Sequence, residues 1–276
     1  MKTKKYIFIT FISIFIFWLV WTNINITTTH IEIENKKIPS GFDDFKIAQV
    51  SDLHNYQWSE KLIRKINMES PDIIAITGDL VDSSKTDFDV ALQFIQDTNK
   101  IAPIYYVTGN HEAWLEDYSV LKEQLEKLNV NMMDDRSLFI EKDSNKIQIL
   151  GVQDPDFVER MNSGNIQGEI VRIKTSEILN KDYFNIVLSH RPEHFEEYVK
   201  VGADLVLTGH AHGGQVRIPF FGGLVAPNQG FFPEYTEGIY NKKNTDMIVS
   251  RGLGNSIIPI RINNTPELVI IKLKTK

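Results

Sequence analysis

The chain has 276 residues, of which 42% are hydrophobic and 24% are charged, enough for one large folded domain or two small ones around a sizeable core. Its net charge of −6, with no basic face visible in the sequence, argues against the phosphate-backbone footprint of a nucleic-acid-binding protein. The absence of cysteine excludes disulfides and thiolate metal sites.

An apolar segment near the amino terminus predicts a membrane anchor. Three lysines, Lys2, Lys4 and Lys5, precede the apolar run 6–21. At ~1.5 Å per residue this run spans about 24 Å as a helix, and continuing through Ile26 supplies the roughly 20 residues that a bilayer core requires. The lysines favour a cytoplasmic amino terminus, which places the rest of the chain on the far side of the membrane. A cleaved signal peptide is the alternative, but no small-x-small cleavage pattern follows the run.

The sequence therefore divides into three expected parts. Residues 1–26 form a single-pass anchor in the cell membrane, residues 27–42 form a tether with a short strand at 31–33, and residues 43–276 form an extracytoplasmic folded domain. A fragment that starts near Ile38 is expected to fold without the anchor, because the first strand of the expected site begins well after the membrane segment.

Strands and helices alternate in the first half of this domain. Such alternation predicts βαβ units and a largely parallel sheet. The later chain is richer in glycine and proline, and its short strand-like segments favour a second sheet that is mixed or antiparallel. The expected early strands are 45–50, 73–77 and 104–107, the expected helices are 58–68, 88–97 and 118–128, and the expected later strands are 138–140, 147–150, 186–188, 205–207, 215–218, 238–240, 247–250 and 268–272.

Side chains that bind metals follow five of the expected strands. Asp52 and His54 stand two residues apart at a strand end, so both can point to one face and reach the same cation. A carboxylate such as that of Asp79 can bridge two cations, and Asn110 offers a neutral carbonyl oxygen. Carboxylates, imidazoles and an amide gathered at strand ends are what a two-metal hydrolytic site requires. The segments are Asp52-Leu53-His54, Gly78-Asp79, Gly109-Asn110-His111-Glu112, Ser189-His190 and Gly209-His210-Ala211-His212.

The order of these five segments resembles the calcineurin-like metallophosphoesterase family over about residues 45–273. The carboxyl-terminal part, with Ser250-Arg251-Gly252-Leu253-Gly254 and Pro259-Ile260-Arg261, resembles the membrane-anchored bacterial branch of the YkuE and YaeI type. The resemblance implies an α/β (α+β) fold in which two mixed sheets, flanked by helices, form a four-layer sandwich. It also implies a hydrolase that cleaves phosphate esters with the help of metal ions.

The resemblance further implies roles for individual residues. One divalent ion would bind Asp52, His54, Asp79 and His212, and a second would bind Asp79, Asn110, His190 and His210. A hydroxide held between the two ions would attack the phosphorus. His111 would face the phosphate and either stabilise developing charge or protonate the leaving oxygen. Manganese, iron and zinc all suit such a mixture of nitrogen and oxygen ligands, and the sequence does not choose among them.

These features together predict a membrane-anchored phosphoesterase that acts on a phosphomonoester or a phosphodiester. One alternative is a phosphodiesterase specific for lipid-linked or cell-wall phosphodiesters, which attachment to the membrane favours. Another is a non-catalytic, metal-stabilised binding protein at the membrane surface. The complete set of ligand residues, together with His111, favours the enzyme over the binding protein.

Several neighbours of the motifs have simpler interpretations. Arg191 fits a surface ion pair better than a contact to a substrate phosphate. Asp82, Asp154 and Asp156 fit loop positions, with contact to the site as the alternative. Glu112 fits a helix start or a support for a ligand better than a ligand itself.

An aromatic stretch late in the chain is typical of residues that pack a loop. The alternative is an apolar lip that receives a lipid or touches the bilayer. The stretch comprises Phe220, Phe221, Leu224, Phe231, Phe232 and Tyr235.

Overall fold

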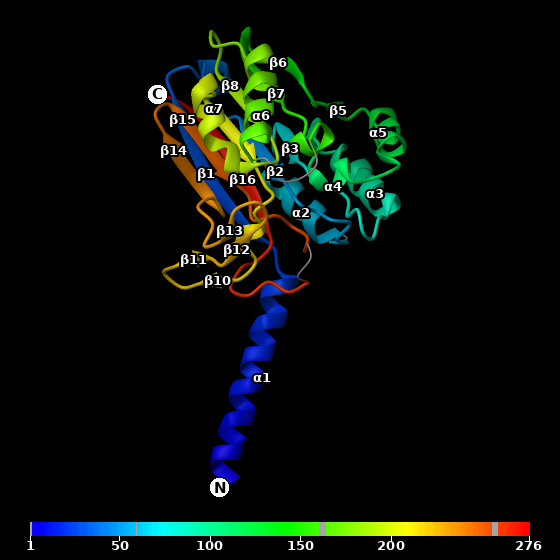
Figure 1. Cartoon of the computed structure of the whole chain (residues 1–276), viewed down its shortest axis with the longest axis vertical. Coiled ribbons are helices and arrows are strands. Elements are labelled where there is room, and N and C mark those ends of the chain that lie inside the picture. Colours follow the sequence, from blue (N-terminus) through cyan, green and yellow to red (C-terminus); the bar gives the residue numbers. More distant parts are fainter. Residues whose placement is uncertain (1, 59, 160–163, 256–258) are drawn as a thin grey trace.

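The computed structural model describes residues 2–58, 60–159, 164–255 and 259–276. Two six-stranded sheets form the body of the domain, and one helix projects away from it (Figure 1). Helices cover the outer face of each sheet, so the layers run helix, sheet, sheet, helix. The predicted fold class, two mixed sheets flanked by helices, is therefore confirmed.

The first sheet is parallel along most of its width, as the alternation of strands and helices predicts. Strands β2 to β5 run parallel, and β16 enters antiparallel to β2. Its strands in spatial order are β1 (Thr27–Asn35), β16 (Glu267–Thr275), β2 (Lys46–Val50), β3 (Ile73–Thr77), β4 (Ile104–Val107) and β5 (Asn131–Met132). The outer face carries α2 (Glu60–Glu69), α3 (Phe88–Thr98) and α5 (Tyr118–Lys127), and α4 (Asn110–Ala113) is a single turn after β4.

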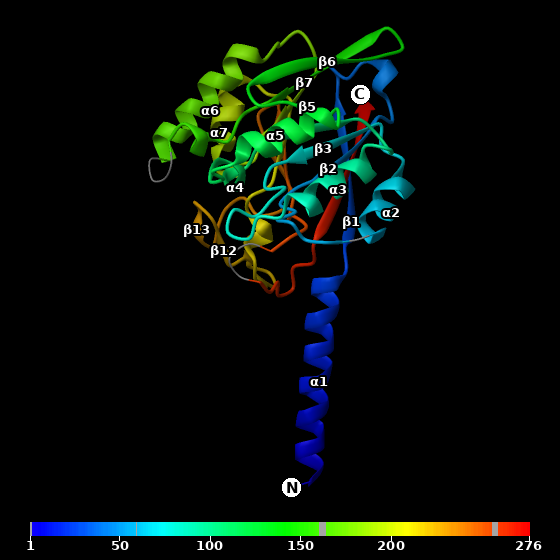
Figure 2. The ribbon, with the colours of Figure 1, turned by 90° about the vertical axis from the view of Figure 1, so that its right-hand side faces the viewer.

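The second sheet is mixed, again as predicted. Its central strands β7, β8, β9 and β15 are parallel, and an antiparallel hairpin closes each edge. In spatial order the strands are β14 (Gly238–Lys242), β15 (Thr245–Val249), β9 (Leu205–Thr208), β8 (Asn185–Leu188), β7 (Asn145–Gly151) and β6 (Arg136–Lys142). Helices α6 (Gly164–Ile178) and α7 (Phe195–Val201) lie on its outer face (Figure 2).

The expected strand at 215–218 is not part of either large sheet. Gln215 has a left-handed backbone, with φ 56°, which interrupts an extended run. Only its last two residues form a strand, and that strand pairs with β11 in a separate hairpin. A second small hairpin follows directly. The strands of the two hairpins are β10 (Arg217–Ile218), β11 (Gly222–Gly223), β12 (Val225–Ala226) and β13 (Gly230–Phe231), and the short 3-10 turns of the chain are η1 (Ser40–Phe42), η2 (Pro155–Phe157), η3 (Pro192–His194) and η4 (His212–Gly214).

Three apolar layers hold the sandwich together, one under each set of helices and one between the sheets. All five residues of β3 are buried, because helices cover one of its faces and the second sheet covers the other. The layer between the sheets includes Ile47, Ile73, Ile186 and Leu205. This central layer fixes how the carboxyl ends of the two sets of strands face each other.

Helix α1 (Lys2–Ile24) is apolar around its whole circumference and lies outside the domain. Its candidate span, Lys4–Ile24, has 21 residues, which at ~1.5 Å per residue covers the roughly 30 Å of a bilayer core. By length and composition α1 fits a single-pass membrane anchor.

The segment expected to be a tether contains a long strand of the first sheet. Strand β1 covers Thr27–Asn35, not only 31–33, and all nine of its residues pair in parallel with β16. Ile33 and Ile38 are buried in the layer between the sheets, as is Phe42. We therefore propose that the folded domain begins at Thr27, with only two residues between it and the end of α1.

Removing β1 is expected to destabilise the domain. A fragment of residues 38–276 loses the strand and the buried side chain of Ile33, so its free energy of unfolding should be at least about 3 kcal/mol lower than that of fragment 27–276. Urea titration of the two fragments, followed by circular dichroism, measures the difference. Equal midpoints would show that β1 is a dispensable tether, as the sequence suggested.

Candidate metal centre

The five motif segments meet because strands from both sheets end at one place. Asp52 follows β2, Asp79 follows β3 and Asn110 follows β4, while His190 and His210 follow β8 and β9 of the other sheet. Two buried hydrogen bonds join the strand ends across the sheets. Gln49 of β2 donates to the carbonyl of Thr208 at 2.8 Å, and His190 Nδ1 lies 2.8 Å from the carbonyl oxygen of Thr77.

The backbone turns sharply at most of these side chains. Asp52, His54, Asp79, His210 and His212 all have φ between 47° and 64°, the left-handed region that non-glycine residues seldom adopt. Two of the carboxylates hold the turns in place. Asp52 Oδ1 accepts from the backbone N–H of His210 at 3.0 Å, and Asp79 Oδ1 accepts from that of His111 at 2.9 Å. Strain of this kind persists where surrounding contacts enforce it, which is common at functional sites.

Gly109 and Gly209 allow the segments to approach closely. A Cβ atom at Gly109 would lie 2.3 Å from Asp79 Oδ1, and one at Gly209 would lie 1.8 Å from the hydroxyl of Ser51. Any side chain at either position would therefore push the motif segments apart.

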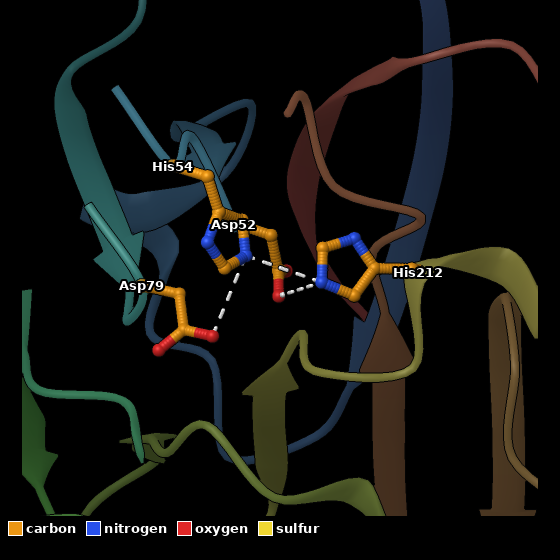
Figure 3. Close-up of side chains that lie close together, drawn as sticks. All are labelled: Asp52, His54, Asp79 and His212. Carbon is orange, nitrogen blue, oxygen red and sulfur yellow. Dashed lines mark hydrogen bonds and ion pairs between the residues drawn. The ribbon is translucent and has the colours of Figure 1, made fainter. Parts of the chain in front are cut away.

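One group of side chains contains Asp52, His54, Asp79 and His212, all buried, with one ligand atom from each within 4.8 Å of the others. His212 Nε2 lies 3.4 Å from Asp52 Oδ1, and His54 Nε2 lies 3.5 Å from Asp79 Oδ2. The two Nε2 atoms face each other at 3.2 Å (Figure 3). Figure 3 shows the two rings and the two carboxylates pointing toward a common centre.

A second group shares Asp79 and adds His190 and His210. His190 Nε2 lies 3.2 Å from Asp79 Oδ2 and 3.1 Å from His210 Nδ1. Asn110 is also buried, and its Oδ1 has no hydrogen-bond partner among the described residues. A buried carbonyl oxygen without a donor is costly unless it has another partner, and a cation is such a partner.

Burial keeps most of the imidazoles neutral. It lowers the pKa of His54 to about 4 and holds the pKa values of His210 and His212 well below the usual value. His190 differs: burial also lowers its pKa, but the charge of Asp79 and its hydrogen bond outweigh burial and raise the pKa to about 10. Neutral rings have a lone pair for a metal, whereas a cation would have to displace the proton of His190.

The donor set fits two divalent cations. Carboxylate oxygens, an amide oxygen and four imidazole nitrogens suit borderline ions such as zinc, manganese or iron. Burial raises the pKa of Asp52 to about 6, whereas at Asp79 the nearby His190 and His111 outweigh burial and hold the pKa well below its usual value. Asp79 therefore stays ionised between the two groups, as a carboxylate shared by two cations must.

His111 lies beside the first group. Its ring stands edge-on to that of His54, with centroids 4.5 Å apart, and also stacks on Trp114. The backbone N–H of Ser83 donates to Nδ1 at 3.0 Å, and the hydroxyl of Ser83 lies 3.2 Å from the same atom. A neutral ring with Nδ1 as acceptor has its proton on Nε2, so it can donate from that atom.

Two further carboxylates lie next to the site: Glu112 supports the ligand loops, as expected, and Asp82 fits the alternative of contact with the site rather than the expected loop position. Glu112 is buried and accepts from the backbone N–H groups of Asp79 and Gly109, at 2.9 and 2.7 Å, so it binds the loops after β3 and β4 together. Asp82 reaches the site: its Oδ2 lies 3.8 Å from His54 Nδ1, and it forms a third group with His54 and His111.

Arg191 is not in a surface ion pair, contrary to the sequence-based interpretation. It is 1% exposed and donates from Nε and Nη2 to Asp154, at 2.7 and 2.9 Å. Asp156 lies 3.2 Å from Nη2, and Nη1 lies 3.2 Å from His210 Nε2. The two aspartates, expected in a loop, hold this guanidinium against a candidate ligand. One feature of the sequence could have predicted that Asp154 lies near the site: it follows β7, which ends at the same edge of the second sheet as β8 and β9.

Replacing Arg191 by methionine is expected to lower the free energy of unfolding by about 3–5 kcal/mol, because it leaves Asp154 and Asp156 buried without a counter-charge. The matched control is Arg172→Met, which removes the ion pairs of an exposed guanidinium with Glu169 and Glu197 and should cost less than ~1 kcal/mol. Urea unfolding of both variants measures the difference. A loss as small for Arg191→Met as for the control would mean that the buried pair contributes nothing to stability.

Comparisons with known proteins agree with this geometry. The family model described as calcineurin-like phosphoesterase matches residues 45–214. The uncharacterised metallophosphoesterase YkuE of Bacillus subtilis is 31% identical over 264 residues, which cover 91% of this chain and 86% of YkuE. The uncharacterised metallophosphoesterase Cj0846 of Campylobacter jejuni is 32% identical over 267 residues, which cover 94% of this chain and 67% of the relative. The crystal structure of TT1561 from Thermus thermophilus has a similar fold. Its TM-score is 0.50 at 14% sequence identity, and the match covers 75% of this chain and 89% of TT1561.

Proposed function

This chain belongs to the calcineurin-like phosphoesterase family, and we propose that it is a membrane-anchored enzyme that hydrolyses a phosphomonoester or a phosphodiester at two metal ions. Membership of this family makes it a metal-dependent hydrolase of phosphate esters. The position of Asp79 supports a dinuclear site: its Oδ2 lies 3.5 Å from His54 Nε2 in one group and 3.2 Å from His190 Nε2 in the other. One carboxylate thus faces two sets of metal-binding side chains.

The proposed division of ligands follows the two groups. One ion would bind Asp52, His54, Asp79 and His212, and the other would bind Asp79, Asn110, His190 and His210. Two such ions, when bound, supply positive charge to the phosphate and activate water as the nucleophile.

His111 is the proposed catalytic residue. Ser83 donates to its Nδ1, which leaves the ring proton on Nε2, and the ring lies against that of His54, beside the first group. From there it can donate to a phosphate oxygen as charge develops or to the leaving oxygen as the bond breaks. Burial of the surrounding side chains strengthens such a hydrogen bond relative to one in water.

We place the domain outside the cytoplasm, on a single-pass anchor formed by α1. The support is the length and apolar character of α1 and the three lysines before its apolar run in the sequence. The substrate would then be a phosphate ester of the extracytoplasmic side or of the membrane itself.

Removal and return of metal tests the proposal. The full-length protein in detergent, stripped with a chelator, should lose turnover of 4-nitrophenyl phosphate and bis(4-nitrophenyl) phosphate. It should regain turnover as two equivalents of manganese, zinc or iron bind per chain. Two bound ions with no hydrolysis of any ester in a mono- and diester panel would instead favour a binding protein, and failure to bind two ions would exclude the dinuclear site.

A further inference from the structure

Four phenylalanines project from the two small hairpins into solvent. Phe220 and Phe221 lie in the turn of the β10–β11 hairpin, Phe231 ends β13, and Phe232 follows it. Their exposed fractions are 106%, 75%, 76% and 64%. Tyr235, from the same aromatic stretch, packs instead against the rings of Phe195 and Tyr240. Loop packing therefore explains Tyr235 but leaves four large apolar side chains in water. We call these four the phenylalanine tips.

Local backbone structure does not explain the phenylalanine tips either. Phe220 has φ 71° and Phe232 has φ 54°, so two bulky residues occupy the left-handed region. Glycine or asparagine would form these turns with less strain. Formation of the turns therefore does not account for aromatic side chains at these two positions.

The β10–β11 hairpin is connected to the end of α1 through residues 261 and 262. Asn23, in the last turn of α1, exchanges two hydrogen bonds with the backbone of Arg261, at 2.8 and 2.9 Å. The adjacent Ile262 accepts from the backbone N–H of Arg217 in β10 at 2.9 Å. Lys61 of α2 also donates to the carbonyl of Ile24. These hydrogen bonds hold the end of α1 and the hairpins on one face of the domain.

Both views of the molecule place this face next to the membrane segment. In Figure 1 and Figure 2 the two hairpins lie at the end of the domain from which α1 departs, and strand β6 lies at the opposite end. Only residues 25 and 26 separate α1 from β1, so no flexible linker can lift this face away from the bilayer.

We propose that the phenylalanine tips insert into the surface of the lipid bilayer that holds α1, so that the domain sits on the membrane in one fixed orientation. This inference rests on the proposed membrane anchor. Exposed aromatic rings beside a membrane helix suit the interfacial zone of a bilayer. Lipid is the fitting occupant, because this apolar face continues from the end of a helix that is itself embedded in lipid.

The same contact fixes the metal centre close to the bilayer. The β10–β11 hairpin packs against η4, which contains His212: the backbone N–H of Leu224 donates to the carbonyl of Gly214 at 3.1 Å. Arg261, bound to α1, has its Nη2 3.4 Å from His212 Nδ1. The substrate class that suits this position is an amphiphile whose phosphate ester lies at the level of the lipid headgroups.

The depth of single labels in the membrane tests the insertion. The chain has no cysteine, so Phe221→Cys and Phe232→Cys each accept one nitroxide label in the full-length protein, reconstituted in vesicles of phosphatidylcholine and phosphatidylglycerol. Phe15→Cys in α1 serves as the lipid-embedded reference. Phe139→Cys, an exposed phenylalanine on β6, serves as the reference in water. Accessibility to oxygen and to a water-soluble nickel chelate should place both hairpin labels between positions 15 and 139, with less contact with the nickel chelate than at position 139.

The outcomes separate this inference from the proposal on which it rests. Hairpin labels that behave like position 139, while position 15 is embedded, would overturn the inference and leave the anchor intact. A label at position 15 that lies in water would refute the anchor itself. Dipolar broadening between hairpin labels, with protection from both relaxants, would show that a second copy of the chain covers the tips and not lipid.

A paired activity measurement tests the substrate class. The double variant Phe220→Asn/Phe232→Asn removes two tips while asparagine tolerates the left-handed backbone. It should hydrolyse 4-nitrophenyl phosphate as the wild type does, but cleave phosphatidic acid or phosphatidylglycerol in vesicles at least about fivefold more slowly. The control Phe139→Asn should change neither rate. Equal rates on vesicles for the double variant and the wild type, or no cleavage of either lipid by a wild type active on soluble esters, would overturn this substrate class.

Discussion

Replacing Asp79 by asparagine is expected to reduce turnover of phosphate esters by more than ~10³-fold and to lower the metal content of the protein. Asparagine matches aspartate in shape but has one neutral oxygen in place of two charged ones. If its carbonyl keeps the hydrogen bond from the His111 backbone, its NH₂ group points at His54 and His190. Hydrogens would then occupy the side from which two cations must be bound.

The matched control is Asp204→Asn, the same chemical change at another buried carboxylate. Asp204 accepts from Lys37 and Asn185 and precedes β9, at the opposite end of that strand from His210. This control should lower stability but leave two ions bound per chain. Metal content by mass spectrometry and turnover of 4-nitrophenyl phosphate are the measurements. An Asp79→Asn protein with two bound ions and near-normal turnover would refute the shared ligand.

The fold and the candidate site follow from the sequence as far as local patterns extend. β3 could be predicted because a fully buried strand is a short run of apolar residues such as Ile73–Thr77. The motif segments could be grouped because each of them follows an expected strand. His54 and Asp79 were expected to be neighbours because the family resemblance implies that they bind one ion, and they are.

Contacts between distant parts of the chain were beyond such patterns. Strand β1 looked like a tether because its partner, β16, lies at the other end of the chain. Arg191 looked exposed because its counter-charge, Asp154, is 37 residues away and belongs to a different loop. Spacing along the sequence does not show which strand ends face each other. A charged residue that will be buried beside a distant counter-charge therefore cannot be told from one that will be exposed.

The hairpins that carry the phenylalanine tips show the same distinction. Composition alone gave two readings of the aromatic stretch, loop packing and contact with lipid. The structure divides the residues between them: Tyr235 packs inside, whereas Phe220 and Phe232 point away from the domain. Their proposed role follows from the position of the hairpins near the end of α1. That position depends on the hydrogen bonds between Asn23 and Arg261, two residues that lie far apart in the sequence.

Replacing His111 by alanine is expected to lower kcat by about 10²–10³-fold while both metal ions remain bound. His111 lies outside the two proposed ligand sets, although it forms a further group with His54 and Asp82. Metal content therefore decides its role: loss of one ion would make His111 a ligand, whereas retention of both with low kcat would support the donor role. Ser83→Ala, which removes the hydroxyl contact but keeps the backbone N–H on Nδ1, should cost less than ~10-fold.

The choice of leaving group distinguishes the two donor roles of His111. 4-Nitrophenolate is a good leaving group without protonation, whereas an alkoxide leaves readily only when it is protonated. If Nε2 protonates the leaving oxygen, His111→Ala should slow an alkyl phosphate far more than 4-nitrophenyl phosphate. If Nε2 stabilises charge on the phosphate oxygens, both substrates should slow to a similar degree. Because Ser83 fixes Nδ1 in either case, the ring keeps one orientation, and the ratio of the two losses reports the position of the proton acceptor.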